Sequence, residues 1–333
     1  MKNKLNRGFR RICRKIVCGI AVAAVALGTA ACSDEGENKE IEVPKAEKAA
    51  SVTNGDLKSD STVIGVGDAA VSYDEYRVYS WFLKNQYEGV LSSEVWDYKL
   101  GDATVGQVAI EDILRLIIQI KVMNKAGAEQ GIGLGIDEKE DIDHKADQYL
   151  ATIPPETQQA NGITRDIMYR IFEENEVARK VYDVTTSAAI ERKEVQAAKV
   201  LLLYLAADDT NREQVRNQAN ALSAELGKYT GNFTSFVKDK TGKAPKEVIL
   251  GSLDGRTGLA STALSMKRYT TSGVVEEKDG FYIMYCLKTS TERLNNTYWE
   301  QYISEEQNRV FQTAYENWAE KYEVKVSKSL LAK

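Results

Sequence analysis

The sequence changes from helical to extended at Ala197-Ala198-Lys199-Val200-Leu201-Leu202-Leu203-Tyr204-Leu205-Ala206. Nine of these ten residues are apolar, and the run of Val and Leu predicts a buried strand. Beyond it, the spacing of apolar residues predicts helices over 211–229 and 233–240, then two strands over 273–287 around the turn Lys278-Asp279-Gly280. A strand followed by helices and a hairpin predicts an α+β unit of roughly a hundred residues.

The sequence before residue 190 predicts helices instead. Residues 63–71 read as two short strands around a Gly-Asp turn, and a helix follows them. The pairs Ser72/Glu75 and Thr104/Gln107 have the spacing of capping boxes, so each predicts the start of a helix. The second of these helices has isoleucine and leucine at steps of three and four from residue 110 to 120, so we expect it at the centre of a helical core. Two more helices are expected over 137–151 and 164–182.

A glycine-rich stretch lies between these helices, at Gly131-Ile132-Gly133-Leu134-Gly135. Alternating glycines are typical of phosphate-binding loops, but those loops belong to a strand–loop–helix unit that this part of the sequence lacks. The stretch therefore predicts the end of a helix and a turn.

The C-terminal part of the chain predicts one long helix over 297–322 and a short strand over 324–326. Phe311, Tyr315, Trp318 and Tyr322 follow each other at steps of four, three and four, which aligns them on one face. We expect this aromatic stripe to pack on the first helical region as core. The alternative is an exposed stripe that binds a client protein.

The N-terminus has the pattern of a secretory signal. Residues 1–31 contain seven Lys or Arg and no acid, and they include an apolar run of twelve residues, 16–27. As a helix that run would cover about 18 Å, too little for a bilayer core of about 30 Å. Gly28-Thr29-Ala30-Ala31-Cys32 then resembles a bacterial lipobox, which predicts lipidation of Cys32, although Thr29 replaces the usual aliphatic residue. The alternative is ordinary cleavage that leaves Cys32 a free thiol.

Charge and composition exclude several classes of protein. The formal net charge of the 333 residues is -5, but from Cys32 onward 49 acidic residues face 37 basic ones, so nucleic acid is not an expected partner. Cys13 and Cys18 lie in the leader, so the mature chain keeps Cys32 and Cys286, and no disulfide is expected if Cys32 is acylated. One histidine and one internal cysteine give neither a zinc site nor a catalytic triad, so we expect no metal, no cofactor and no hydrolytic chemistry.

Several stretches resemble the SurA and PrsA family of extracytoplasmic foldases. The likeness to the N-terminal helical domain of that family lies in 71–76, 128–132, 137–143 and 161–164. The likeness to its parvulin-type rotamase domain lies in 197–201, 231–236, 263–267, 272–275 and 280–284. The resemblance covers about nine-tenths of the mature body. It implies a helical chaperone domain that is completed by the C-terminal helix, with the α+β rotamase domain inserted between them.

The rotamase-like part departs from the family at the positions that carry catalysis. A competent parvulin usually has histidine where this sequence has Lys199 and Tyr282, and an acid or cysteine near Lys243. Prolyl isomerisation needs an apolar proline pocket over a polar network, and a charged lysine accepts no hydrogen bond. The resemblance therefore implies a rotamase domain without activity. Leu259, Leu264 and Met266 are candidates for an apolar substrate groove, with a core role as the alternative.

These observations predict a membrane-anchored extracytoplasmic chaperone that holds unfolded secreted proteins. An active peptidyl-prolyl isomerase is the alternative, and a solute-binding lipoprotein is a third possibility that the single mixed unit disfavours. The expected organisation is a signal peptide at 1–31, a solvated tether at 32–61, a helical domain at 62–190, a parvulin-like domain at 196–290, and a C-terminal helix at 292–333 that packs on the helical domain.

Overall fold

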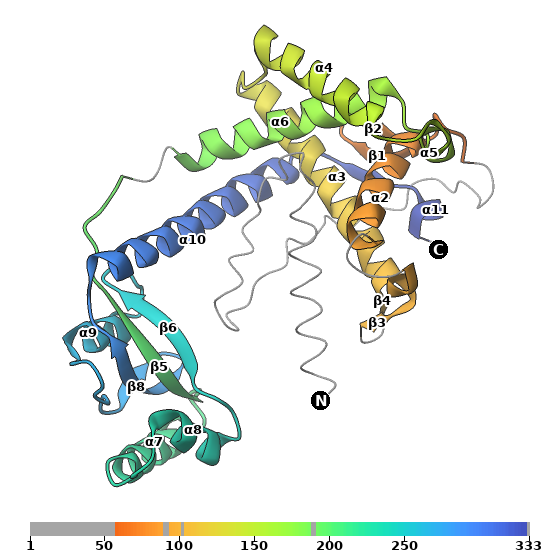
Figure 1. The fold of residues 1–333 in the computed structure, drawn as a ribbon. Coiled ribbons are helices and arrows are strands. Elements are labelled where there is room, and N and C mark those ends of the chain that lie inside the picture. Colours follow the sequence, from red (N-terminus) through yellow and green to blue (C-terminus); the bar gives the residue numbers. More distant parts are fainter. Residues whose placement is uncertain (1–56, 89–92, 101–102, 188–190, 332–333) are drawn as a thin grey trace. The chain divides into compact units, whose positions relative to one another are not determined.

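The computed structural model describes residues 57–88, 93–100, 103–187 and 191–331. The expected signal peptide, Cys32 and all but the end of the expected tether lie outside these residues. The chain divides into two compact units, one made of residues up to 189 together with those from 307 onward, and the other of residues 190–306 (Figure 1). We call them the helical unit and the mixed unit.

The helical unit contains a small antiparallel sheet with the strand order β2-β1-β9. Strands β1 (Thr62–Val66) and β2 (Ala69–Ser72) form the expected hairpin, with Gly67 in the left-handed region at φ 58°. Strand β9 (Val324–Val326) pairs with β1, although almost the whole chain separates the two in sequence. The predicted last strand is therefore present, and it joins the C-terminus to the beginning of this unit.

The helices of this unit begin where the capping pattern predicts. Helix α2 (Tyr73–Glu88) follows Ser72, whose Oγ accepts a hydrogen bond from the Glu75 amide at 3.2 Å. Helix α3 (Val105–Glu129) begins after Thr104, with both hydrogen bonds of the capping box to Gln107 present. The remaining elements are 3-10 helix η1 (Ser93–Asp97), strands β3 (Lys99–Leu100) and β4 (Ala103–Thr104), and helices α4 (Ile136–Ala151), α5 (Pro155–Asn161), α6 (Arg165–Ser187) and α11 (Lys328–Leu331).

A cluster of charged residues lies inside this unit, between α2, α3 and α6. The ammonium group of Lys121 is 2.8 Å from Glu75 Oε1 and 2.6 Å from Glu174 Oε1, and Arg170 approaches the other oxygen of Glu75 at 3.5 Å. The side chain of Glu75 is fully buried and that of Lys121 is 4% exposed. Because an isolated buried carboxylate would be very costly, Lys121 is essential to this arrangement.

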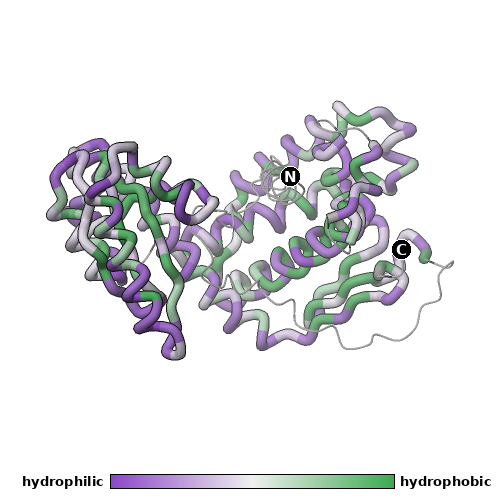
Figure 2. The backbone as a smooth tube through the Cα atoms, turned by 90° about the horizontal axis from the view of Figure 1, so that it is seen from below, coloured by the Kyte–Doolittle hydropathy of each residue, from purple (hydrophilic) through white to green (hydrophobic). Residues whose placement is uncertain are grey.

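The mixed unit is built on a four-stranded antiparallel sheet with the order β6-β5-β8-β7. The strands are β5 (Ala197–Ala206), β6 (Lys246–Gly251), β7 (Val275–Glu277) and β8 (Gly280–Lys288). Helices α7 (Arg212–Leu226) and α8 (Phe233–Thr241) contribute to a core on one face, and α9 (Thr257–Ser265) to a core on the other face. In Figure 2 the strands carry long hydrophobic stretches, while the helices alternate between hydrophobic and hydrophilic residues.

Helix α10 (Glu292–Ala319) contributes to the cores of both units. Its beginning packs in the mixed unit, where Tyr298 and Trp299 share a cluster with Ala197. Its second half carries the aromatic stripe, and Phe311 and Tyr315 are 1% and 3% exposed in the core of the helical unit. The prediction that this stripe is core is therefore confirmed. The helix begins at Glu292, five residues before the start that the apolar spacing predicts, because Leu294 and its neighbours have apolar partners of their own in the mixed unit.

The fold class is α+β, as the sequence predicted, with a helical unit that the C-terminal segment completes and a mixed unit inserted in it. Within the part of the chain that the structure describes, none of the helices has the length and apolar character required to span a bilayer.

Candidate functional site

Lys199 and Tyr282, the two positions at which a parvulin usually carries histidine, face opposite sides of the sheet. Val200 and Leu202 pack in the same core cluster as Tyr282, on the side of α9. Because successive residues of a strand point to opposite faces, Lys199 points to the other side. There its ammonium group forms an ion pair with Glu247 of the neighbouring strand β6.

The strand register separates the same two residues along the sheet as well. Lys199 lies opposite Ile249 in β6 and Lys288 in β8, near the beginning of β5. Tyr282 lies opposite Tyr204, near the other end of that strand. The two positions therefore do not form one polar network.

Lys243, the third position that the resemblance singled out, belongs to neither neighbourhood. It is exposed in the loop between α8 and β6, where its amide donates a hydrogen bond to Thr241 Oγ1 at 3.2 Å. Among the described residues, no hydrogen bond or ion pair joins Lys243 to Lys199 or Tyr282.

Tyr282 instead forms a network with two residues that sequence reasoning did not select. Its hydroxyl donates to Asp279 Oδ2 at 2.6 Å, and Arg256 Nη1 donates to the same hydroxyl at 3.2 Å. Burial and the hydrogen bond to the Asp279 carboxylate raise the pKa of Tyr282 above its ordinary value. The hydroxyl therefore stays protonated and acts as a fixed hydrogen-bond donor.

An aromatic pair connects this network to the surface. The ring of Tyr204 stacks on that of Tyr282 with 4.7 Å between centroids and 25° between planes. Tyr204 is 45% exposed, whereas Tyr282 is 3% exposed, and the hydroxyl of Tyr204 donates to the backbone oxygen of Asp279 at 2.8 Å. The side chains of Arg256 and Asp279 are each about half exposed. The site therefore offers the Arg256 guanidinium as a donor, the Asp279 carboxylate as an acceptor and one flat aromatic face to a ligand from solvent.

The loop that carries Arg256 is held in place by helix α10. Tyr298 accepts a hydrogen bond from the Leu253 amide at 3.0 Å and donates to Asp254 Oδ1 at 3.2 Å. The other oxygen of Asp254 accepts from the Gly251 amide at 2.6 Å. Arg256 follows this turn and directly precedes α9, so the turn sets its position.

The three candidate groove residues lie on the same face of the sheet, but mostly in its core. Leu259 is fully buried, and Leu264 and Met266 are half-buried against the same core cluster. Their participation in substrate binding stays a prediction.

The polar network of this unit was partly accessible from the sequence. Asp279 lies in the predicted turn before Gly280, and Gly280 pairs with Ala206. That pairing places Tyr204 opposite Tyr282, but it is a long-range contact between β5 and β8, and the turn itself, which joins β7 to β8, does not predict it. Nothing comparable points to Arg256, because it lies in a loop whose course depends on contacts with α10.

No family model matches this sequence, and no curated protein matches it. Among solved structures, the peptidylprolyl isomerase PrsA from Bacillus anthracis is 14% identical over 63% of this chain and 97% of its own, with a TM-score of 0.37. PrsA from Bacillus cereus is 12% identical over 82% of this chain and 96% of its own, with a TM-score of 0.33. A structure described under PEB4 and Cj1289, two SurA-like chaperones of Campylobacter jejuni, is 14% identical over 80% of this chain and 99% of its own, with a TM-score of 0.28. These matches cover most of this chain at low sequence identity.

Proposed function

We propose that this protein is a membrane-anchored extracytoplasmic chaperone that holds unfolded secreted proteins, and that its rotamase-like unit does not isomerise prolyl bonds. The observation that carries this proposal is the placement of Lys199 and Tyr282 on opposite faces of the sheet. A parvulin needs one polar network beneath its proline pocket, and these positions do not supply one.

The anchor and the compartment rest on the N-terminal sequence. A basic leader, an apolar run of twelve residues and small residues converge on Cys32. The tether that follows is rich in acids and lacks aromatic residues, which keeps it solvated and lets it hold the body away from the membrane surface.

One observation favours the alternative of an active isomerase. The polar network lies beside the exposed ring of Tyr204, and it consists of Tyr282, Asp279 and Arg256. Stabilising a twisted prolyl amide requires a polar network beside an apolar surface. In that case catalysis would depend on the hydroxyl of Tyr282, and Lys199 would be dispensable.

Aggregation of a chemically denatured secreted enzyme, followed by light scattering, tests the proposed function. The protein should suppress aggregation at a stoichiometric ratio, and a variant with Lys199→Ala and Tyr282→Phe should protect equally well. Circular dichroism serves as the control that this variant is folded. Absence of protection by the wild type would contradict the chaperone function, and loss of protection in the folded variant would place client binding in the rotamase-like unit.

A further inference from the structure

The loop between α3 and α4 presents an isoleucine to solvent. Ile136, the first residue of α4, is 78% exposed, the largest exposed fraction among the large hydrophobic residues that the structure describes. The next in order is Tyr269 at 58%. The loop before Ile136 contains the glycine-rich stretch 131–135, and neither core packing nor the rotamase-like site accounts for the exposure of Ile136.

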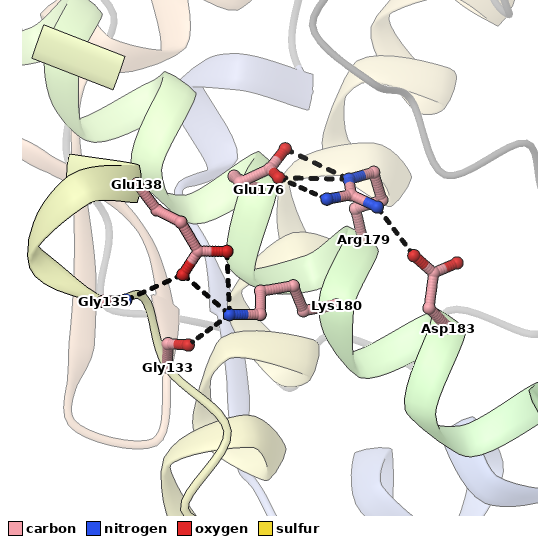
Figure 3. A network of polar contacts seen from close by, with 7 residues as sticks. All are labelled: Gly133, Gly135, Glu138, Glu176, Arg179, Lys180 and Asp183. Carbon is pink, nitrogen blue, oxygen red and sulfur yellow. Dashed lines mark hydrogen bonds and ion pairs between the residues drawn. The ribbon is translucent and has the colours of Figure 1, made fainter. Parts of the chain in front are cut away.

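Polar contacts fix the backbone around this residue (Figure 3). Lys180 of α6 donates to the Gly133 oxygen at 2.9 Å and to Glu138 Oε2 at 2.8 Å. The same Glu138 oxygen accepts from the Gly135 amide at 2.7 Å. Ile136 follows Gly135 directly, so these contacts also fix the backbone at Ile136. A partner that covers the Ile136 side chain therefore does not pay the entropy cost of ordering the loop.

A second exposed apolar residue lies on the helix that holds the loop. Val184 of α6 is 51% exposed and follows Lys180 by four residues. Residues four apart lie on the same face of a helix, so Val184 is on the α6 face from which Lys180 reaches the loop.

The charges around Ile136 that have no partner are negative. Asp137, Glu140 and Asp141 are exposed and form no hydrogen bond or ion pair among the described residues. Glu140 follows Ile136 by four residues and shares its helix face. The cations nearest to Ile136 are already paired, Lys139 with Glu173, Lys180 with Glu138, and Arg179 with Glu176 and Asp183; Lys145, further along α4, is exposed and forms no ion pair among the described residues.

We infer that Ile136, with Asp137, Glu140 and Asp141, forms a docking surface for unfolded segments in which an apolar side chain lies next to Lys or Arg. The inference rests on the proposed chaperone function and names the class of client segment. Burial of Ile136 supplies apolar contact, and the three unpaired acids select cationic neighbours and repel acidic ones. Because these acids are exposed, the selection weakens as salt concentration rises.

Two fluorescent peptides of equal length test this surface, one of Leu, Ser and Lys and the other with Glu in place of each Lys. Binding to the purified protein is followed by anisotropy at low and high salt. The Lys peptide should bind more tightly, and Ile136→Ser should weaken its binding about tenfold, as expected for an exposed isoleucine that becomes largely covered. Neutralisation by Asp137→Asn, Glu140→Gln and Asp141→Asn together should weaken binding at low salt and flatten the salt dependence.

Matched controls lie in the mixed unit. Tyr269→Asn removes the large apolar side chain that is second in exposure to Ile136. Tyr269 has left-handed backbone dihedrals, which asparagine tolerates. Glu191→Gln, Glu194→Gln and Asp209→Asn together remove three exposed acids that form no hydrogen bond or ion pair among the described residues. Both controls should keep the wild-type affinity and salt dependence for the Lys peptide.

Equal affinity of the wild type for both peptides would overturn the inference, and so would unchanged peptide binding by Ile136→Ser. If Ile136→Ser changed only the sedimentation coefficient, this face would be a contact between two copies of the chain, and the inference would also be wrong. These results are distinguishable from failure of the proposed function. If the wild type suppresses aggregation but the variants bind the peptide normally, only this inference is wrong. If the wild type does not suppress aggregation, the chaperone function is wrong.

Discussion

Lys121 is the residue on which the interior of the helical unit depends most. Lys121→Met should lower the free energy of unfolding by about 3–5 kcal/mol, because it leaves the fully buried Glu75 and the largely buried Glu174 facing each other without their shared cation. Urea unfolding followed by circular dichroism measures this loss. Lys139→Met is the matched control, since Lys139 pairs with Glu173 at the surface, and it should change stability only slightly. A loss no larger than that of the control would contradict the assigned role of Lys121.

Glu174 predicts how the stability of this unit depends on pH. Burial raises the pKa of its carboxyl above the ordinary value of 4.5, against the opposing effect of Lys121. As pH rises, the unfolded chain releases this proton first, so the free energy of unfolding falls between about pH 4.5 and the raised pKa. Relative to Glu174→Gln, the wild type should lose at most about 1.4 kcal/mol per pH unit in that window.

Thermal or urea unfolding at several pH values between about 4.5 and 7 checks this prediction. Glu173→Gln changes the neighbouring carboxyl, which lies at the surface, and should keep the wild-type pH profile. A wild-type stability that rises relative to Glu174→Gln over this range would reverse the assigned sign.

At the scale of elements, the contact between α10 and the loop after β6 predicts different outcomes for two glycines. A Cβ at Gly251 would lie 2.4 Å from Cζ of Tyr298, whereas a Cβ at Gly255 meets no atom within 4 Å. Gly251→Ala should therefore destabilise the protein by about 1–3 kcal/mol through overpacking. Gly255→Ala should be neutral or slightly stabilising, because alanine restricts the unfolded chain. Equal effects of the two substitutions, measured by urea unfolding, would mean that Tyr298 does not hold this loop.

Helices with a strong local signal in the sequence, such as a capping box or a regularly spaced apolar stripe, were predictable. The capping boxes at Ser72 and Thr104 and the aromatic stripe at Phe311 and Tyr315 predict the helices and their buried faces, because these signals are local. The apolar spacing alone predicts a helix only from residue 297, since the first turns of α10 gain their apolar partners from residues near the beginning of β5.

The candidate site was less predictable than the elements that carry it. The resemblance implies that Lys199 and Tyr282 belong to one site. A shift of one residue along a strand, however, moves a side chain to the other face of the sheet. The register follows from the pairing of Gly280 with Ala206, which is a long-range contact. Arg256 depends on the Tyr298 and Asp254 contacts and has no local signal at all.

At the scale of the whole molecule, the proposed anchor predicts where the protein is found. Cys32→Ala should release the protein from membranes into the soluble extracytoplasmic fraction, because the acyl attachment point is lost. Fractionation and immunoblotting of the wild type and the variant measure this, with Cys286→Ala as the matched control, since Cys286 is a free thiol in the core of the mixed unit. A Cys32→Ala product that stays on membranes after its leader is removed would refute lipid anchoring.

The most direct test of the account is the rate constant of cis-to-trans isomerisation of a proline-containing peptide as a function of protein concentration. Because Lys199 and Tyr282 lie on opposite faces of the sheet, we expect the uncatalysed rate constant at every concentration that protects a client from aggregation. A rate constant that rises in proportion to protein concentration, and that Tyr282→Phe returns to the uncatalysed value, would contradict the account and assign isomerase activity to the Tyr282 network.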